Sequence, residues 1–222
     1  MISHLLAAIA ETGFPCRFYG GTALNRSHVA GGRLSEDIDL MVDDISVDVG
    51  AVLRRPLLRH VGDTTWELRS RRTSMRTYDV TALGTPVQLQ LVRFDRDDRR
   101  WGWEQRPVEL RYSCLPDHVV MNLPVRDGFV AMKLNAYTER WAPRDLMDLA
   151  NLAGRGAITA QAVARYRHAT GRGVSLDDFA SVRSPTRAGW NAELGRQMAE
   201  PGEPEEAVQI VHDALALAAR SA

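Results

Sequence analysis

Cysteine is scarce in this sequence of 222 residues, and lysine is almost missing. The two cysteines, Cys16 and Cys114, lack metal-type spacing and are too few for a disulfide framework, and the six histidines are scattered. These absences exclude a structural zinc site and a disulfide-stabilised secreted domain. No apolar run approaches the length of a membrane span, and no basic segment followed by an apolar one opens the chain. We therefore expect a reduced, cytoplasmic protein with no membrane partner.

An excess of charge of one sign is also lacking, because the formal net charge is zero. The charges are nevertheless unevenly distributed. Residues 53–112 contain thirteen arginines and eight acids, whereas residues 190–222 contain two arginines and six acids. The basic middle suits a local nucleic-acid face, but a solvated surface in an arginine-rich protein explains it equally well.

Lysine occurs once, at Lys133, among 28 basic residues. Such a bias usually reflects coding composition, which replaces lysine by arginine wherever a surface charge suffices. A lysine that remains suits a position that needs a compact ammonium instead of a planar guanidinium. The neighbours of Lys133 are apolar, so its stem can pack while its head reaches a cleft. We expect Lys133→Ala to behave like a surface change, within roughly 0.5 kcal/mol of wild-type stability.

A glycine turn followed by a carboxylate pair stands near the start of the chain. Residues 18–24 predict a strand, a turn at Gly20-Gly21 and a helix from Thr22, and residues 37–42 predict a second strand. Alternate residues of a strand face the same side, so Asp37 and Asp39 project together, with their Cα atoms about 7 Å apart. Paired carboxylates suit Mg2+, which also binds substrate phosphates, and a glycine turn at a helix start lets amides approach a phosphate.

Each half of this pattern has a simpler explanation. An Asp-x-Asp pair alone also occurs at solvated strand ends and in glycosyltransferase-like metal sites, and a lone Gly-Gly is usually a turn. The two together, about fifteen residues apart across a strand–helix–strand unit, favour nucleotide chemistry.

A second group of charged residues lies between positions 133 and 148. Lys133 and Arg140 are seven apart and share one helix face, and Asp145 and Asp148 share a face of the next helix. Read alone, acids in a first helical turn and an adjacent arginine indicate only favourable dipole contacts and surface ion pairs.

The remaining pattern predicts an α+β chain with two lobes. Helical spacing covers residues 3–11 and 45–60, the second interrupted by Pro56. Strands are expected at residues 15–19, 64–69, 75–81, 86–94 and 107–113, with a charged loop over 95–103. Helices are expected at residues 127–140, 143–152, 159–168, 176–181, 185–198 and 204–219. The boundary near Pro124 predicts an α/β lobe over residues 1–124 and a helical lobe over residues 125–222.

The two motifs together resemble the AbiEii/AbiGii-type nucleotidyltransferase toxins, a group that includes the MenT toxins and belongs to the DNA polymerase β-like nucleotidyltransferase superfamily. Gly-Gly-Thr-Ala-Leu at 20–24 and Arg-Leu-Ser-Glu-Asp-Ile-Asp-Leu at 33–40 resemble the first motif. Lysine, arginine seven residues on, and Arg-Asp-x-x-Asp-Leu at 144–149 resemble the second and third. The tail around Trp190 is also similar, so the resemblance covers most of the chain.

The resemblance implies a polymerase β-like lobe with a mixed sheet and a helical lobe that contributes Lys133, Asp145 and Asp148 to a cleft. It implies Mg2+ or Mn2+ as metal and an NTP as substrate. The implied catalytic residues are Asp37, Asp39, Lys133 and Asp145, of which Asp37 and Asp39 hold metal. The implied nucleotide-binding residues are Gly20, Gly21, Thr22, Ser35, Lys133, Arg140, Arg144 and Asp148.

The resemblance further implies a toxin of a toxin–antitoxin pair, with an antitoxin encoded nearby and, as in several relatives, tRNA 3′ ends as acceptors. Two alternatives stay open: nucleotidyl transfer to a protein or small molecule, and a catalytically silent nucleotide-binding module. The sequence identifies neither the nucleotide nor the antitoxin, nor the oligomeric state.

One feature departs from the family pattern. Polymerase β-like enzymes commonly carry a third carboxylate on a strand next to the metal strand, whereas residues 87–92 offer only Gln88 and Gln90. Asp79 on the partner strand, or Asp145 from the helix, would have to serve. The general base is therefore open, whereas the metal pair is intact.

Overall fold

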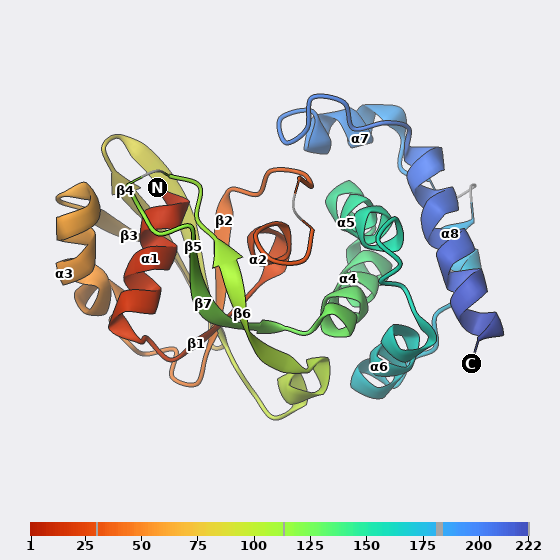
Figure 1. Cartoon of the computed structure of the whole chain (residues 1–222), viewed down its shortest axis with the longest axis horizontal. Coiled ribbons are helices and arrows are strands. Elements are labelled where there is room, and N and C mark those ends of the chain that lie inside the picture. Colours follow the sequence, from red (N-terminus) through yellow and green to blue (C-terminus); the bar gives the residue numbers. More distant parts are fainter. Residues whose placement is uncertain (30, 113, 181–183, 222) are drawn as a thin grey trace. The chain divides into compact units, whose positions relative to one another are not determined.

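The computed structural model describes residues 1–29, 31–112, 114–180 and 184–221. The chain forms two compact units (Figure 1). The sheet unit comprises Met1–His28, Ser35–Asp95 and Glu104–Leu123, and the helical unit comprises Val29–Leu34, Arg96–Trp103 and Pro124–Ala222. Two short stretches that are distant in sequence from the C-terminal helices thus belong to the helical unit.

The sheet unit is built on a mixed sheet of five strands in the order β1-β2-β5-β4-β3. β2 is parallel to β5, and the other neighbouring pairs are antiparallel. The strands are β1 (Cys16–Tyr19), β2 (Asp37–Val42), β3 (Thr65–Arg71), β4 (Met75–Ala82) and β5 (Thr85–Arg93), and a separate two-stranded sheet comprises β6 (Trp103–Glu109) and β7 (His118–Pro124). The predicted mixed α+β architecture is confirmed.

Three helices accompany this sheet and connect its first strands. They are α1 (Ile2–Thr12), α2 (Gly20–Asn25) and α3 (Val49–Val61), and α1 lies beside α3 (Figure 1). Phe18, Leu40 and Leu91 are fully buried on one face of neighbouring strands, so the core of the unit forms there. Burial of such side chains contributes about 2 kcal/mol each and outweighs weak local propensities.

The helical unit contains α4 (Arg126–Arg140), α5 (Pro143–Ala153), α6 (Ala160–Thr170), α7 (Arg187–Leu194) and α8 (Pro204–Arg220), with short 3-10 turns η1 (Asp97–Trp101) and η2 (Leu176–Phe179). α4 packs against α5 and α6, and α5 packs against α7 and α8. Trp190 and Tyr137 are fully buried among these helices. Pro143 and Pro204 stand in the first turns of their helices, where the missing N–H costs nothing.

Several predicted boundaries are wrong. α3 continues through Pro56, because its buried face of Val49, Leu53 and Leu57 outweighs one lost hydrogen bond. The strand expected at 107–113 ends at Glu109, β7 was not expected at all, and Ser113 lies outside the described residues.

The remaining differences concern where short helices begin and end. α2 begins at Gly20 and not at Thr22, and the loop expected at 95–103 contains the 3-10 turn η1. The helix expected at 176–181 is the single 3-10 turn η2, with residue 181 outside the described part, and the helix at 185–198 shortens to α7.

Candidate active site

Asp37 and Asp39 occupy alternate positions at the start of β2. Both carboxylates are half-buried, whereas Ile38 and Leu40 between and after them are fully buried. The alternation places the two carboxylates on the polar face of the sheet and the aliphatic side chains in the core. Both apolar neighbours anchor the strand, so the carboxylates are held on a rigid element.

Gly20, in the glycine turn, lies against the carboxylate of Asp39. Its φ of +80° is a left-handed conformation that side chains other than glycine rarely adopt. A β-carbon on Gly20 would lie 2.1 Å from Oδ2 of Asp39. The absence of a side chain at this position is therefore what allows the Asp39 carboxylate to lie against the start of α2.

Thr22 ties the same helix to the same strand. Its buried hydroxyl donates a 2.5 Å hydrogen bond to the main-chain carbonyl of Asp37. Gly21 is buried in the first turn of α2, and Ser35 is half-buried in the irregular segment that leads into β2. The sheet unit thus brings Gly20, Gly21 and Thr22 to the carboxylate strand.

The neighbouring strands determine which further groups share this face. In register, Asp37 pairs with Gln88 and Asp39 with Gln90 on β5, and Gln88 pairs with Asp79 on β4. The strand beside β2 therefore carries amides, as the sequence predicts. Asp79 is two strands from Asp37, about 10 Å at the usual strand spacing, and its Oδ2 accepts a 2.6 Å bond from Nε of Arg69.

Asp37 and Asp39 are consequently the adjacent pair of carboxylates that this face offers to a cation. Across the described ranges, no group of three or more histidine, cysteine or acidic side chains is arranged to hold a metal ion. A pair of carboxylates nevertheless fits Mg2+, which commonly takes one or two protein carboxylates and completes its shell with water and substrate phosphates.

A buried ion cluster stands in the helical unit. Nζ of Lys133 lies 3.0 Å from Oδ1 of Asp145 and 2.6 Å from Oδ2 of Asp148. The Lys133 residue is 7 % exposed, and both aspartates are essentially inaccessible. The predicted shared faces of α4 and α5 are confirmed by these contacts. The expectation that Lys133 behaves as a surface residue is wrong, because its ammonium is buried between two carboxylates.

Two arginines complete the cluster. Nε of Arg140 donates to Oδ2 of Asp145 at 2.6 Å. Arg33 donates from Nε and Nη2 to the two oxygens of Asp148, both at 2.9 Å, and from Nη1 to the side chain of Gln197 at 2.8 Å. Sequence reasoning did not select Arg33 as a site residue, although it opens the quoted Arg-x-Ser-Glu-Asp stretch. Arg33 is only 4 % exposed in the fold. This burial marks Arg33 as part of the cluster, and it can be seen only in the structure.

The cluster alters the proton affinity of Asp145. Burial alone would raise the pKa of this carboxyl, but the charges and hydrogen bonds of Lys133 and Arg140 outweigh burial and hold the pKa below its ordinary value. Asp145 is therefore an ion-paired carboxylate, with both oxygens engaged.

Arg144 differs from its neighbours in sequence. Its side chain is exposed, and its main-chain N–H donates to Glu193 at 3.4 Å. The structure thus brings Arg140, Asp145 and Asp148 together with Lys133, whereas Arg144 faces solvent.

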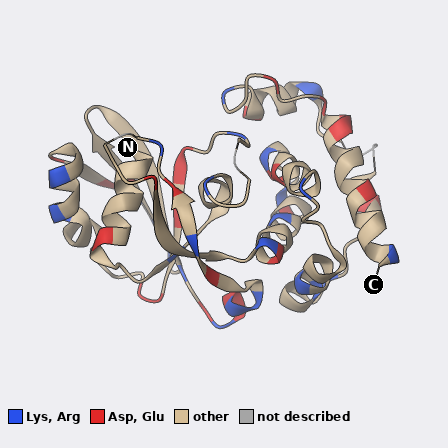
Figure 2. Cartoon of the chain, viewed as in Figure 1, with Lys and Arg blue, Asp and Glu red and all other residues tan. Residues whose placement is uncertain are grey.

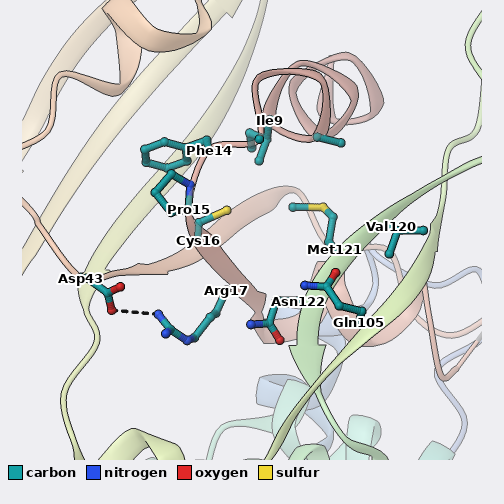
Figure 3. Close-up of a pocket in the computed structure, with 12 residues that line it drawn as sticks. Ile9, Phe14, Pro15, Cys16, Arg17, Asp43, Gln105, Val120, Met121 and Asn122 are labelled. Atoms are coloured by element: carbon teal, nitrogen blue, oxygen red, sulfur yellow. Dashed lines mark hydrogen bonds and ion pairs between the residues drawn. The ribbon is translucent and has the colours of Figure 1, made fainter.

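A pocket of about 340 Å³ in the sheet unit lies elsewhere (Figure 3). Its wall includes Cys16, Arg17, Met121 and Asn122, and Nη1 of Arg17 pairs with Asp43 at 3.0 Å. Cys16 pairs with Val42, three residues along β2 from Asp39 or about 10 Å. The pocket is therefore at the other end of β1 and β2 from the carboxylate pair.

Nearly the whole chain is similar to two solved structures, one of them a nucleotidyltransferase toxin. The toxin MenT4 of Mycobacterium tuberculosis H37Rv matches with a TM-score of 0.63 at 17 % identity, over 98 % of this chain and 81 % of its own. JHP933 of Helicobacter pylori matches with a TM-score of 0.66 at 14 % identity, over 99 % of this chain and 89 % of its own. At identities this low, the structural likeness shows a shared fold and nothing more.

The sequence itself supplies the family. A comparison of the sequence with curated proteins finds no match. No helix in the described part of the chain is long and apolar enough to cross a bilayer. The family model described as "Nucleotidyl transferase AbiEii toxin, Type IV TA system" matches residues 4–214. This chain therefore belongs to the AbiEii nucleotidyltransferase toxin family, whose members act with an antitoxin in toxin–antitoxin systems.

Proposed function

We propose that this enzyme transfers a nucleotide from an NTP to the 3′ end of tRNA. The observation that supports the proposal is the Asp39 carboxylate packed against Gly20. This contact joins the pair proposed to bind metal to the turn proposed to bind phosphate. In the proposed reaction, an acceptor hydroxyl oxygen bonds to the α-phosphorus, the bond to pyrophosphate breaks, and the hydroxyl proton leaves to a base or to solvent.

Asp37 and Asp39 are the residues that would hold Mg2+ or Mn2+. A divalent cation bound there would supply positive charge to the phosphate oxygens and increase the acidity of the attacking hydroxyl. The chain's own contribution is rigidity, because the buried side chains of Ile38 and Leu40 and the Thr22 hydrogen bond fix the strand that carries both carboxylates.

The glycine turn is the proposed triphosphate site. Gly20 and Gly21 leave the main chain open to a close approach by phosphate oxygens. Thr22 acts through its hydrogen bond to the Asp37 carbonyl, which couples the turn to the carboxylate strand. Ser35, in the segment before β2, is proposed to offer its hydroxyl to the same phosphates.

Lys133 is proposed to offset the negative charge of the nucleotide. A preorganised cation in a water-poor environment stabilises developing charge more than the same cation in bulk water. Asp145 and Asp148 act by orienting the Lys133 ammonium, and Arg140, with half of its side chain exposed, can contact a phosphate directly. Arg144, whose side chain is exposed, is proposed to contact the nucleotide as well.

An RNA acceptor is supported by arginines that gather at one end of the sheet. Arg71 lies directly opposite Arg76 on β3 and β4, Arg72 follows Arg71, and the Arg93 guanidinium donates to the carbonyl of Thr73 in the same turn. Asp44 is a nearby carboxylate: hydrogen bonds from Ser46 chiefly lower its pKa, and the charges of Arg76 and Arg93 lower it further. Like charges placed opposite each other destabilise a sheet, so this arrangement suits a phosphate backbone.

The decisive experiment supplies the enzyme with each labelled NTP, Mg2+ and total RNA, and asks which polymer becomes labelled. We expect label in tRNA with wild-type enzyme and none with Asp39→Asn, which keeps the side-chain volume but removes the charge. Circular dichroism should show the same fold for both. Label in protein or in a small molecule would contradict the RNA acceptor, and near-normal labelling by Asp39→Asn would contradict the metal pair. Co-expression with the neighbouring gene product tests for the cognate antitoxin.

A further inference from the structure

The pocket of about 340 Å³ in the sheet unit has apolar and sulfur-bearing walls (Figure 3). Phe14 and Pro15 supply carbon atoms to these walls, and Cys16 and Met121 supply sulfur atoms. Burial raises the pKa of the Cys16 thiol to about 12, so the thiol stays protonated and uncharged. Sulfur atoms make favourable contacts with the edges of aromatic rings. The volume lies within the usual range of small-molecule sites, about 300–1,000 Å³.

Two side-chain amides line the same pocket, one from each strand of the two-stranded sheet. Gln105 lies on β6 and Asn122 on β7. Figure 3 shows both amides across the pocket from Phe14 and Pro15. Each amide offers a hydrogen-bond donor and an acceptor side by side. This is the combination with which asparagine and glutamine bind the edge of a nucleobase.

Arg17 contributes to the polar side of the pocket with its charge already paired. Its Nη1 lies 3.0 Å from Oδ1 of Asp43, the bond marked in Figure 3. Its guanidinium carbon lies 3.4 Å from the centre of the Phe94 ring, a cation–π contact that fixes the side chain further. Because Asp43 balances Arg17, the pocket suits an uncharged polar ring better than a free anion.

The pocket lies at the same end of the five-stranded sheet as the arginines proposed to contact RNA. Cys16 pairs with Val42, and Val42 pairs with Arg93, so Arg93 is two strands or about 10 Å from Cys16. Arg71 and Arg76 stand opposite each other at this end of β3 and β4. Single-stranded nucleic acids are bound in this way, with bases against apolar side chains and phosphates on nearby cations.

We propose that this pocket binds the base of an unpaired RNA nucleotide, whose neighbouring phosphates lie on the arginines at the end of the sheet. The ring packs between the apolar and sulfur-bearing walls, and Gln105 and Asn122 form hydrogen bonds with its edge. The site is distinct from the glycine turn, because Cys16 lies about 10 Å along the strands from Asp39. The assignment to RNA rests on the proposed function, whereas the preference for a base rests on the pocket alone.

The first test is calorimetric titration with each of the four ribonucleosides in buffer with EDTA. Nucleosides carry no phosphate, so this measurement needs no metal, no acceptor and no transfer activity. Val120 lines the pocket and is 56 % exposed, so Val120→Trp fills the pocket from a position that tolerates a larger side chain. Only the affinity that Val120→Trp removes is assigned to the pocket.

The amides are tested by the double variant Gln105→Leu with Asn122→Leu. We expect it to weaken the assigned affinity at least about tenfold, because two hydrogen bonds to the base are lost. Gln161→Leu is the matched control, since it replaces an exposed glutamine on α6 and should leave the affinity unchanged. If the double variant does not fold, Gln105→Leu alone replaces it, because Gln105 is exposed and its loss costs little stability.

A second test separates RNA from a free nucleoside as the ligand. A labelled single-stranded oligoribonucleotide of the preferred base should bind more tightly than the nucleoside. Its affinity should fall both in the amide variant and in Arg71→Glu with Arg72→Glu. An oligonucleotide that binds wild-type protein and the amide variant equally well would overturn RNA as the source of the base.

Two results would overturn the base pocket itself: no nucleoside binding that Val120→Trp removes, or wild-type affinity in the amide variant. A wild-type enzyme that binds nucleosides here but labels no RNA in the transfer assay would overturn the proposed function and leave the base pocket intact.

Discussion

Oδ2 of Asp39 lies 2.1 Å from the place where a β-carbon on Gly20 would stand. The Asp39 carboxylate on β2 therefore occupies the space that a side chain at position 20 would need. A side chain at position 20 would have to displace the Asp39 carboxylate.

The first prediction concerns this contact. Gly20→Ala should abolish nucleotide transfer, because the new methyl group must push the Asp39 carboxylate away. It should also lower the free energy of unfolding by about 1–2 kcal/mol, since alanine is strained at positive φ. Gly84→Ala is the matched control: its φ is +74°, and nothing lies within 4 Å of the added carbon. Equal activity losses in both variants would contradict a specific role for Gly20.

The second prediction concerns Lys133. Lys133→Ala should lower the free energy of unfolding by about 3 kcal/mol, because two buried carboxylates lose a partner. Lys133→Arg keeps the charge, but the wider guanidinium does not fit between the same oxygens. We expect a loss of about 10²–10³ in the transfer rate for this variant.

Urea unfolding and single-turnover labelling measure these two effects separately. Arg144→Met is a suitable control for stability, because the Arg144 side chain is exposed. A Lys133→Arg enzyme with the wild-type rate would mean that the single lysine is an accident of composition.

The third prediction concerns acid stability. The folded pKa of Asp145 lies below the ordinary value of 3.8, so between the two values the unfolded chain binds more protons than the folded chain. The ion pair therefore contributes fully to stability above about pH 4, and this contribution is lost as the pH falls through the folded pKa. Asp145→Asn should flatten the acid side of the stability curve, whereas Asp63→Asn at an exposed position should not. Parallel acid limbs in all three proteins would refute the assignment.

The fourth prediction concerns the arginines at the end of the sheet. If RNA phosphates bind there, Arg71→Glu with Arg72→Glu should reduce the slope of log affinity against log salt by about 0.7 for each lost contact. The pair Arg54→Glu with Arg55→Glu changes the same charge on α3, which carries basic residues (Figure 2). Both side chains are exposed, and this change should leave the slope nearly unchanged. Filter binding of labelled tRNA at several salt concentrations provides the measurement. Equal slopes for both double variants would indicate a solvated surface.

Local pattern was sufficient for the elements that carry the chemistry. The alternation around Asp37 and Asp39 and the helical spacing of residues 127–140 and 143–152 depend on neighbours within a few positions, and the structure confirms both. The turn predicted at Gly20-Gly21 is instead the start of α2. Burial of one face determines whether such a segment forms a helix or a strand. The spacing of apolar residues along the sequence shows which of the two is favoured. Pro56 shows the limit of local rules, because packing of the α3 face outweighed the proline.

The sequence by itself determined the family, the carboxylate pair and the unusual position of Lys133. Only the tertiary structure decided what surrounds them. Arg33 and Asp148 are 115 positions apart, yet they form a bidentate contact in the cluster where Lys133 is buried, although local pattern placed this lysine at a surface. Charge pairing over such separations has no period along the chain, because it follows from the meeting of whole elements in the fold.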